Sequence, residues 1–280
     1  MTMDFSRRRL GTGALAVAGC SAFAPLAWAI PPVRVPETAR AAESAEALPL
    51  PSAINKSGRQ RMLSQRLGKA WAMLALGVEP EMAAKIRKQS EALFISQLGE
   101  LQKTTPTPEI TAAVAALAQA WENYKRDLAL PPSKENAAPV YASGDQTLQR
   151  AHALTLLYEK RMATPQGHLV NIAGRQRMLS QRMARAFYFS KFGIATDTAF
   201  DLATAHKEFI AGLDELVHAP QNTSGIRQEL TLAEQQWVFY EASIDGRIQG
   251  ARADRDVATT SERILEELNL ITAKYEAIAG

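Results

Sequence analysis

The chain has 280 residues, of which 46% are hydrophobic, so it is long and apolar enough to bury a sizeable core. Its single cysteine, Cys20, excludes an intramolecular disulfide, and its four histidines lack metal-ligand spacing, so we expect no metal and no cofactor. The net charge is +3, and residues 1–29 hold +2 of it, so the near-neutral remainder disfavours a nucleic-acid partner. We expect no enzymatic activity, because the sequence shows no nucleophile–base pair and no phosphate-binding loop.

Residues 1–29 have the features of an export signal. The basic run Arg7-Arg8-Arg9 is twin-arginine-like, an apolar stretch follows, and Ala27-Trp28-Ala29 offers a cleavage site. A competing interpretation is that Val17-Ala18-Gly19-Cys20 is a lipobox, which would make the protein a lipoprotein anchored to the membrane at Cys20. We favour cleavage after Ala29, because the residues after Cys20 stay apolar, as a continuing signal core would. We therefore expect a periplasmic protein, exported by a twin-arginine-like or Sec signal.

Residues 30–51 are rich in Pro and Ala and are predicted to form a linker. Beyond them the chain is rich in good helix formers and shows no strand pattern. Prolines at first-turn positions and Pro-rich breaks divide this part into eight helices. The expected ranges are 52–77, 80–103, 107–129, 141–163, 165–193, 197–218, 224–249 and 256–279, with a loop at 131–140.

The main feature of the sequence is an internal repeat. Residues 55–66 return as residues 171–182, an offset of 116, with ten of twelve positions identical. Trp121 and Tyr124 return at the same offset as Trp237 and Tyr240. We therefore predict an all-α fold of two tandem up-down four-helix bundles, over residues 52–163 and 164–280.

The repeated helix has two contact faces at helical spacing. The face expected to pack into its own bundle carries Leu63, Leu67, Trp71 and Leu74, and in the second copy Leu179, Met183, Phe187 and Ser190. The opposite face carries Ile54, Gly58, Arg61, Gln65 and Gly68, and in the second copy Val170, Gly174, Arg177, Gln181 and Ala184. A glycine inside a helix costs about 0.5–1 kcal/mol relative to Ala. Its recurrence in this slot indicates that another helix approaches closely there.

Four antiparallel helices return the chain to the end where it began, so the first helices of the two copies should run parallel. Their Gly/Arg/Gln faces could then meet about a pseudo-twofold axis. Arg61 and Arg177 would face one another, which favours an anion between them. Spacing alone favours a plainer alternative, in which these polar residues form a solvated face. Arg59, Arg66, Arg175 and Arg182 lie on another side of the helix and are expected at the surface or in salt bridges between helices.

The block Ile54-Asn-Lys-Ser-Gly-Arg-Gln-Arg-Met-Leu-Ser-Gln-Arg-Leu67 and its second copy resemble the motif at the head of the PilJ/NarX-type sensor domain. That domain is the periplasmic module of nitrate/nitrite sensor kinases and of a type IV pilus chemotaxis transducer. The resemblance implies a four-helix bundle and nitrate binding between two first helices through the arginine that precedes the methionine. These residues are Arg61 and Arg177 here, and Gly58 and Gly174 match the flanking glycine.

The resulting expectation is a periplasmic ligand-binding or sensory module for a small oxyanion, nitrate or nitrite first. Arg61 and Arg177 would hold the anion, Gly58 and Gly174 would permit close helix approach, and Gln65 and Gln181 would add hydrogen bonds. The alternative is a ligand-free interaction or scaffold module that docks on a membrane sensor kinase or chemoreceptor.

Overall fold

The computed structural model describes residues 48–194 and 198–280, and this part of the chain is helical, without a strand. The predicted all-α class is therefore confirmed. The helices are α2 (Leu50–Leu76), α3 (Pro80–Gln102), α4 (Pro108–Leu128), α5 (Ala137–Met162), α6 (Pro165–Ser190), α7 (Thr198–Val217), α8 (Ser224–Ile244) and α9 (Gly250–Ala279). The predicted export signal, with Cys20, and residues 30–47 of the predicted linker lie outside the described residues. None of the described helices is long and apolar enough to span a bilayer.

Local signals place most helix ends where the sequence predicts them. Thr107, Thr164 and Thr223 each cap a helix, and the side chain of each accepts a hydrogen bond from a backbone N–H three residues on. Prolines occupy the first turns of α3, α4 and α6, where no helical N–H partner is required.

Three predicted helix ranges were wrong at one end by several residues. The helix expected from residue 141 begins at Ala137, because Pro139 falls in its first turn and does not interrupt the hydrogen-bond ladder. The helix expected to reach residue 249 ends at Ile244, and the next begins at Gly250 instead of residue 256. Gly246 adopts a left-handed conformation with φ of 84°, which ends α8 early.

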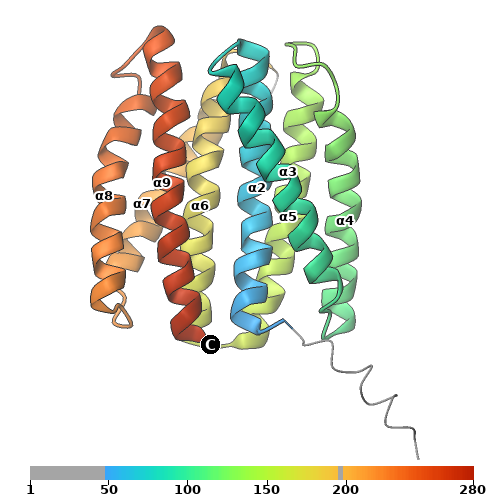
Figure 1. Cartoon of the computed structure of the whole chain (residues 1–280), viewed down its shortest axis with the longest axis vertical. Coiled ribbons are helices and arrows are strands. Elements are labelled where there is room, and N and C mark those ends of the chain that lie inside the picture. Colours follow the sequence, from blue (N-terminus) through green and yellow to red (C-terminus); the bar gives the residue numbers. More distant parts are fainter. Residues whose placement is uncertain (1–47, 195–197) are drawn as a thin grey trace, which may run out of the picture. The chain divides into compact units, whose positions relative to one another are not determined.

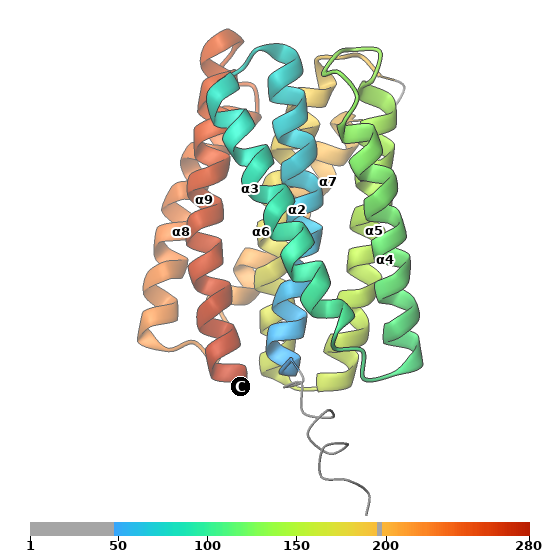
Figure 2. The same cartoon turned by 45° about the vertical axis from the view of Figure 1, so that its right-hand side comes forward.

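The two copies form one compact unit over residues 46–280. α2 packs against α3 and α5, and α6 packs in the equivalent way against α7 and α9, while α4 and α8 cover the last helix of their own copies. The most extensive contact in the unit joins α2 to α6. These two helices lie side by side at its centre and start from the same end, as Figures 1 and 2 show. They are thus parallel, as the topology predicts.

Most of the predicted bundle core is buried. Leu63, Leu67 and Trp71 are fully buried, as are Leu179 and Met183 of the second copy, while Leu74 and Phe187 are half-buried. Ser190 was predicted wrongly, because it is the last residue of α6 and is exposed. The neighbouring Phe189 fills the core there and stacks on Trp71, with ring centroids 6.0 Å apart.

Candidate functional site

The second face of α2 and α6 is buried along its whole length. All ten residues predicted for it are buried, and the side chains of Arg61 and Arg177 have no exposed surface. The solvated-face alternative is therefore wrong, because each of these helices covers that face of the other. Sequence periodicity could not decide this, since a polar stripe looks the same whether it faces water or another helix.

Arg61 is held by residues of two other helices. Its Nη2 donates to the side-chain Oδ1 of Asn171 at 2.8 Å and to the backbone oxygen of the same residue at 3.2 Å. Its Nη1 lies 3.3 Å from Nδ1 of His152 on α5. A guanidinium has no acceptor, so Nδ1 of His152 accepts this hydrogen bond and the imidazole proton resides on Nε2. Arg61 of the first copy is thus anchored by an asparagine of the second.

Arg177 repeats the arrangement with the copies exchanged. Its Nη2 donates to Oδ1 of Asn55 at 2.7 Å and to the backbone oxygen of that residue at 3.4 Å. Its Nη1 donates to Oδ1 of Asn269 on α9 at 3.1 Å. Asn269 occupies the place that His152 holds in the other half. The two halves therefore match, except that a neutral amide replaces a titratable imidazole.

We call Arg61 and Arg177 the arginine pair. Neither residue forms an ion pair with any described residue. The acceptors of Arg61 and Arg177 are uncharged, and the Nε of each is buried without a hydrogen-bond partner. The nearest carboxylates contact the asparagines that hold the arginine pair and not the guanidinium groups themselves. Glu159 accepts from Nδ2 of Asn171 at 2.7 Å, and Glu276 accepts from Nδ2 of Asn55.

Burial and like charge make the arginine pair electrostatically unfavourable as it stands. Burial and the nearby Arg175 lower the pKa of Arg61 to about 9, against a partial opposing effect of Glu159. Burial, Arg59 and Arg61 together lower the pKa of Arg177, with Glu276 opposing. Both groups stay protonated at neutral pH, because guanidinium is such a weak acid. The site therefore concentrates positive charge that its own contacts do not neutralise.

The two glycines leave room for the guanidinium groups. A Cβ on Gly58 would lie 3.0 Å from Nη2 of Arg61. A Cβ on Gly174 would lie 3.3 Å from Nη2 of Arg61 and 3.4 Å from Nη2 of Arg177. Both guanidinium groups thus border the same point beside Gly174. The close approach of another helix that was expected at this slot is seen at Gly174, whereas the atoms nearest to a Cβ on Gly58 belong to Arg61 of the same helix.

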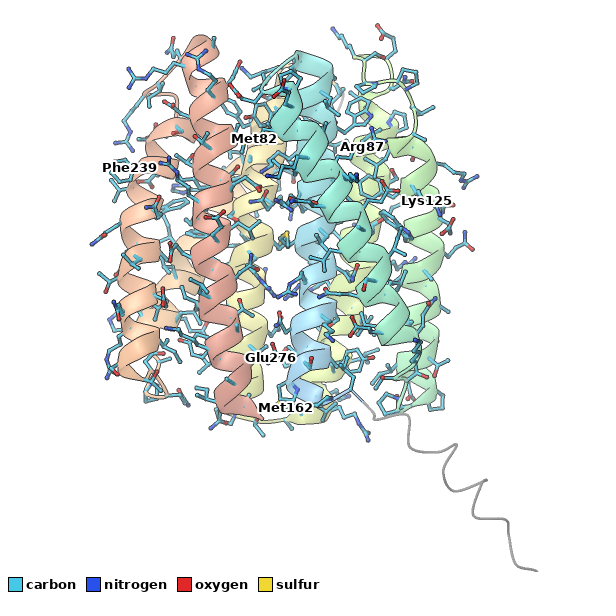
Figure 3. All side chains as sticks on the ribbon, in the orientation of Figure 1. Met82, Arg87, Lys125, Met162, Phe239 and Glu276 are labelled. Atoms are coloured by element: carbon cyan, nitrogen blue, oxygen red, sulfur yellow. The ribbon has the colours of Figure 1, made fainter. Side chains whose placement is uncertain are left out.

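A surface groove reaches the residue that holds Arg177. It has a volume of about 310 Å³, and Arg59, Glu262 and Asn269 are among its lining residues. Figure 3 labels Glu276, the residue of α9 that accepts a hydrogen bond from Asn55 of α2. Asn269, which accepts from Arg177, is therefore reached from the surface on this side.

Gln65 and Gln181 make their contacts within the helix seam. Nε2 of Gln181 donates to the backbone oxygen of Ser261 at 2.8 Å, while its Oε1 is buried without a partner. Oε1 of Gln65 accepts from Nη1 of Arg185 at 2.6 Å. These two amides brace the seam next to the arginine pair, and a direct contact with a ligand stays a prediction.

A second pair of buried cations lies eight residues further along the same two helices, about 12 Å away at the helical rise. Lys69 donates to Glu262 of α9 at 2.6 Å, and Arg185 donates to Asp145 of α5 at 2.6 Å. We call Lys69 and Arg185 the ion-paired cations. Each takes its carboxylate from the other copy, so the copies are joined by charge as well as by packing.

The remaining arginines of the repeated block lie where the sequence predicts them. Arg66 pairs with Glu262, and Arg175 and Arg182 pair with Glu208 and Asp201, each at 2.9 Å. Arg59 is half-buried, and its closest opposite charges are Glu276 and Glu100. The expected salt bridges between helices are confirmed for the first three.

Sequence reasoning missed the residues that hold the arginine pair. Asn55 and Asn171 open the repeated block, so the repeat itself was a signal that could have singled them out. His152 and Asn269 carry no such signal, because they differ from each other and lie in helices with little sequence similarity. Only the packing of α5 and α9 against α2 and α6 brings them to the site.

Comparison with known proteins agrees with the repeat. The family model described as type IV pili methyl-accepting chemotaxis transducer N-term, PilJ, matches residues 44–154 and again residues 161–268. No curated protein and no solved structure matches the chain. The two matches cover most of the chain, and each contains one of the two repeated arginine helices. The protein therefore belongs to the PilJ family of sensory and signalling domains and carries that domain twice.

Proposed function

We propose that the protein is a periplasmic sensory module that binds one small oxyanion, nitrate or nitrite first, between α2 and α6. The observation that carries this proposal is the arginine pair: two fully buried guanidinium groups border one point and have no carboxylate partner. Buried charges in proteins are normally paired. The ion-paired cations on the same helices follow that rule, so the exception at Arg61 and Arg177 marks a place for an anion.

An oxyanion suits the donors that are left over. Arginine presents a planar set of N–H groups that matches an oxyanion, and the unpartnered Nε atoms of Arg61 and Arg177 supply free donors. Each charge-assisted hydrogen bond contributes roughly 1.5–3 kcal/mol. Two arginines would then give a dissociation constant on the order of millimolar to micromolar. Both guanidinium groups crowd the point beside Gly174, which favours a small planar anion over a larger one.

Calorimetry with nitrate and nitrite tests this proposal. One anion should bind per chain, and Arg61→Ala or Arg177→Ala should each remove most of the binding. The double variant should lose little more than either single variant, because both residues serve one ligand. Arg182→Ala is the matched control, since Arg182 lies in the same block but pairs with Asp201. Two equivalent sites per chain, or unchanged binding in Arg61→Ala, would contradict the shared clamp.

A second candidate function is a ligand-free docking module for a membrane sensor kinase or chemoreceptor. It is favoured by Val238 and Phe239, which are 60% and 62% exposed on α8. The equivalent positions in α4 hold the polar residues Glu122 and Asn123. If no small anion raises the melting temperature of the protein and Phe239→Glu abolishes association with a membrane receptor, this function replaces the first.

The proposed periplasmic location rests on the sequence of residues 1–29. Mass spectrometry of the exported protein should find a chain that starts at Ile30. A diacylglycerol group on Cys20 would instead establish a lipoprotein. Either result keeps the anion site outside the cytoplasm, whereas an intact N-terminus on a cytoplasmic protein would contradict the proposed location.

A further inference from the structure

The two halves of the site differ at one position that contacts the arginine pair. Arg61 and Arg177 have the same asparagine partners, but Nη1 of Arg61 faces His152 whereas Nη1 of Arg177 faces Asn269. Among the described residues, His152 is therefore the one group in direct contact with either guanidinium that can change its charge between pH 5 and 8. A duplicated chain permits this difference, since its two copies can diverge independently.

We infer that His152 couples anion binding at the arginine pair to the uptake of one proton, so that the module senses acidity together with its anion. This inference rests on the proposed function. His152 would be a positioning residue that accepts from Arg61 when the site is empty. It would become a second cation beside the anion when the site is filled.

The surroundings of His152 keep it neutral in the empty site. Burial, Arg61 of α2 and Arg175 of α6 lower its pKa, and they outweigh Glu159 of its own helix and Glu208 of α7, which act to raise it. A proton on Nδ1 would point at Nη1 of Arg61 across 3.3 Å, placing two like charges in contact. The empty site thus opposes protonation.

An anion next to Arg61 reverses the preference of His152 for its neutral form. Its negative charge offsets the repulsion between Arg61 and an imidazolium, so the pKa of His152 is higher in the complex than in the free protein. By linkage, a group with a higher pKa in the complex takes up a proton on binding, and affinity rises as the pH falls through that range. A rise of one pKa unit corresponds to a tenfold tighter dissociation constant at low pH.

One other histidine lies near this network and supplies a control. His168 contacts Glu159 at 2.7 Å and Glu215 at 2.8 Å, so it stands behind Asn171 and away from the guanidinium. Hydrogen bonds to these two carboxylates raise its pKa, although burial opposes the shift. It is already protonated more readily than a free histidine, and an anion at Arg61 should change its protonation little.

Nitrate calorimetry at pH 5.5, 6.5 and 8 tests the inference, since nitrate keeps its charge throughout. In the wild type, the dissociation constant should fall by roughly tenfold from pH 8 to pH 5.5. Titrations in buffers of different ionisation enthalpy should show proton uptake at intermediate pH. His152→Asn gives both halves the same amide and should remove the pH dependence, while His168→Asn should retain it.

The reciprocal variant Asn269→His should make the pH dependence steeper, because each arginine then faces an imidazole. Thermal unfolding of all variants shows whether each is folded. Nitrate binding that is independent of pH in the wild type, or equally pH-dependent in His152→Asn, would overturn the coupling and leave the clamp intact. A wild-type protein that binds no nitrate at any of these pH values would overturn the clamp and the coupling together.

Discussion

The arginine pair and the ion-paired cations lie on the same faces of α2 and α6, and all four side chains are fully buried. The last helices of the two copies, α5 and α9, present different partners to the two pairs. Asp145 of α5 and Glu262 of α9 give the ion-paired cations a carboxylate each, whereas two turns later His152 and Asn269 give the arginine pair neutral partners. The comparison separates buried charges that the chain neutralises itself from buried charges that it leaves without a counterion.

The electrostatics of the ion-paired cations differ from those of the arginine pair. Burial opposes ionisation of Glu262, yet Lys69 and Arg66 lower its pKa to about 2. Asp145 raises the pKa of Arg185 against the effect of burial. Arg185 also lies over the ring of Tyr141, 3.7 Å from its centroid. Burial still lowers the pKa of Lys69, so Glu262 does not fully offset its desolvation.

Removing the carboxylate from the ion-paired cations should have the largest effect on stability. Glu262→Gln leaves Lys69 buried without a counterion, and we expect it to lower the free energy of unfolding by about 3–5 kcal/mol. Urea denaturation followed by circular dichroism measures this. The matched variant Glu266→Gln removes a carboxylate one turn away that forms no ion pair in the described structure, and should change little. Equal effects of the two variants would contradict the structural role of Glu262.

The same carboxylate should make stability depend on acidity. The pKa of Glu262 is lowered from 4.5 to about 2, so its contribution is present above about pH 4.5 and is lost as the pH falls towards 2. This shift corresponds to about 3 kcal/mol. Urea denaturation between pH 6 and 3 should show a decline that Glu262→Gln lacks. A parallel decline in both proteins would assign the acid sensitivity to other groups.

Giving the arginine pair a carboxylate of its own should change the free energy of unfolding by a smaller amount and in the opposite direction. Asn269→Asp places a carboxylate of the same shape against Nη1 of Arg177, which now donates to the amide at 3.1 Å. We expect the ligand-free protein to gain about 1 kcal/mol, because a charged acceptor strengthens the hydrogen bond. Nitrate binding should weaken at least tenfold, since the chain then supplies its own anion. Unchanged affinity would show that Arg177 is not part of the anion site.

The smallest change in stability should accompany Gly174→Ala. Its Cβ would press on both guanidinium groups while the helix gains a residue of better propensity, so the two effects largely cancel, to within about 1 kcal/mol. Nitrate affinity should nevertheless fall, because the methyl group occupies the point where the guanidinium groups meet. Gly99→Ala is the control, since nothing lies within 4 Å of its Cβ and only the propensity gain applies. A Gly174→Ala protein that binds nitrate normally would place the anion elsewhere.

Local sequence determined the helices and the faces that they bury. First-turn prolines, capping threonines and the 116-residue repeat are local or one-dimensional signals, so they located the helices and indicated that α2 and α6 have two contact faces. The predictions of helix ends and core residues that were wrong also have local causes. Pro139 was tolerated in a first turn, Gly246 ended α8, and Ser190 lost its core position because α6 stopped there.

Only the tertiary structure determines which kind of partner each buried charge has. Arg61 and Lys69 sit on one helix face in similar sequence surroundings, and nothing local distinguishes a cation that meets an amide from one that meets a carboxylate. That difference depends on which turns of α5 and α9 reach the seam between α2 and α6, and the contacts concerned join residues that are 40 to 193 positions apart in sequence. The electrostatic energy of a buried charge is set by its neighbours in space, so only the assembled fold could reveal an arginine pair without a counterion.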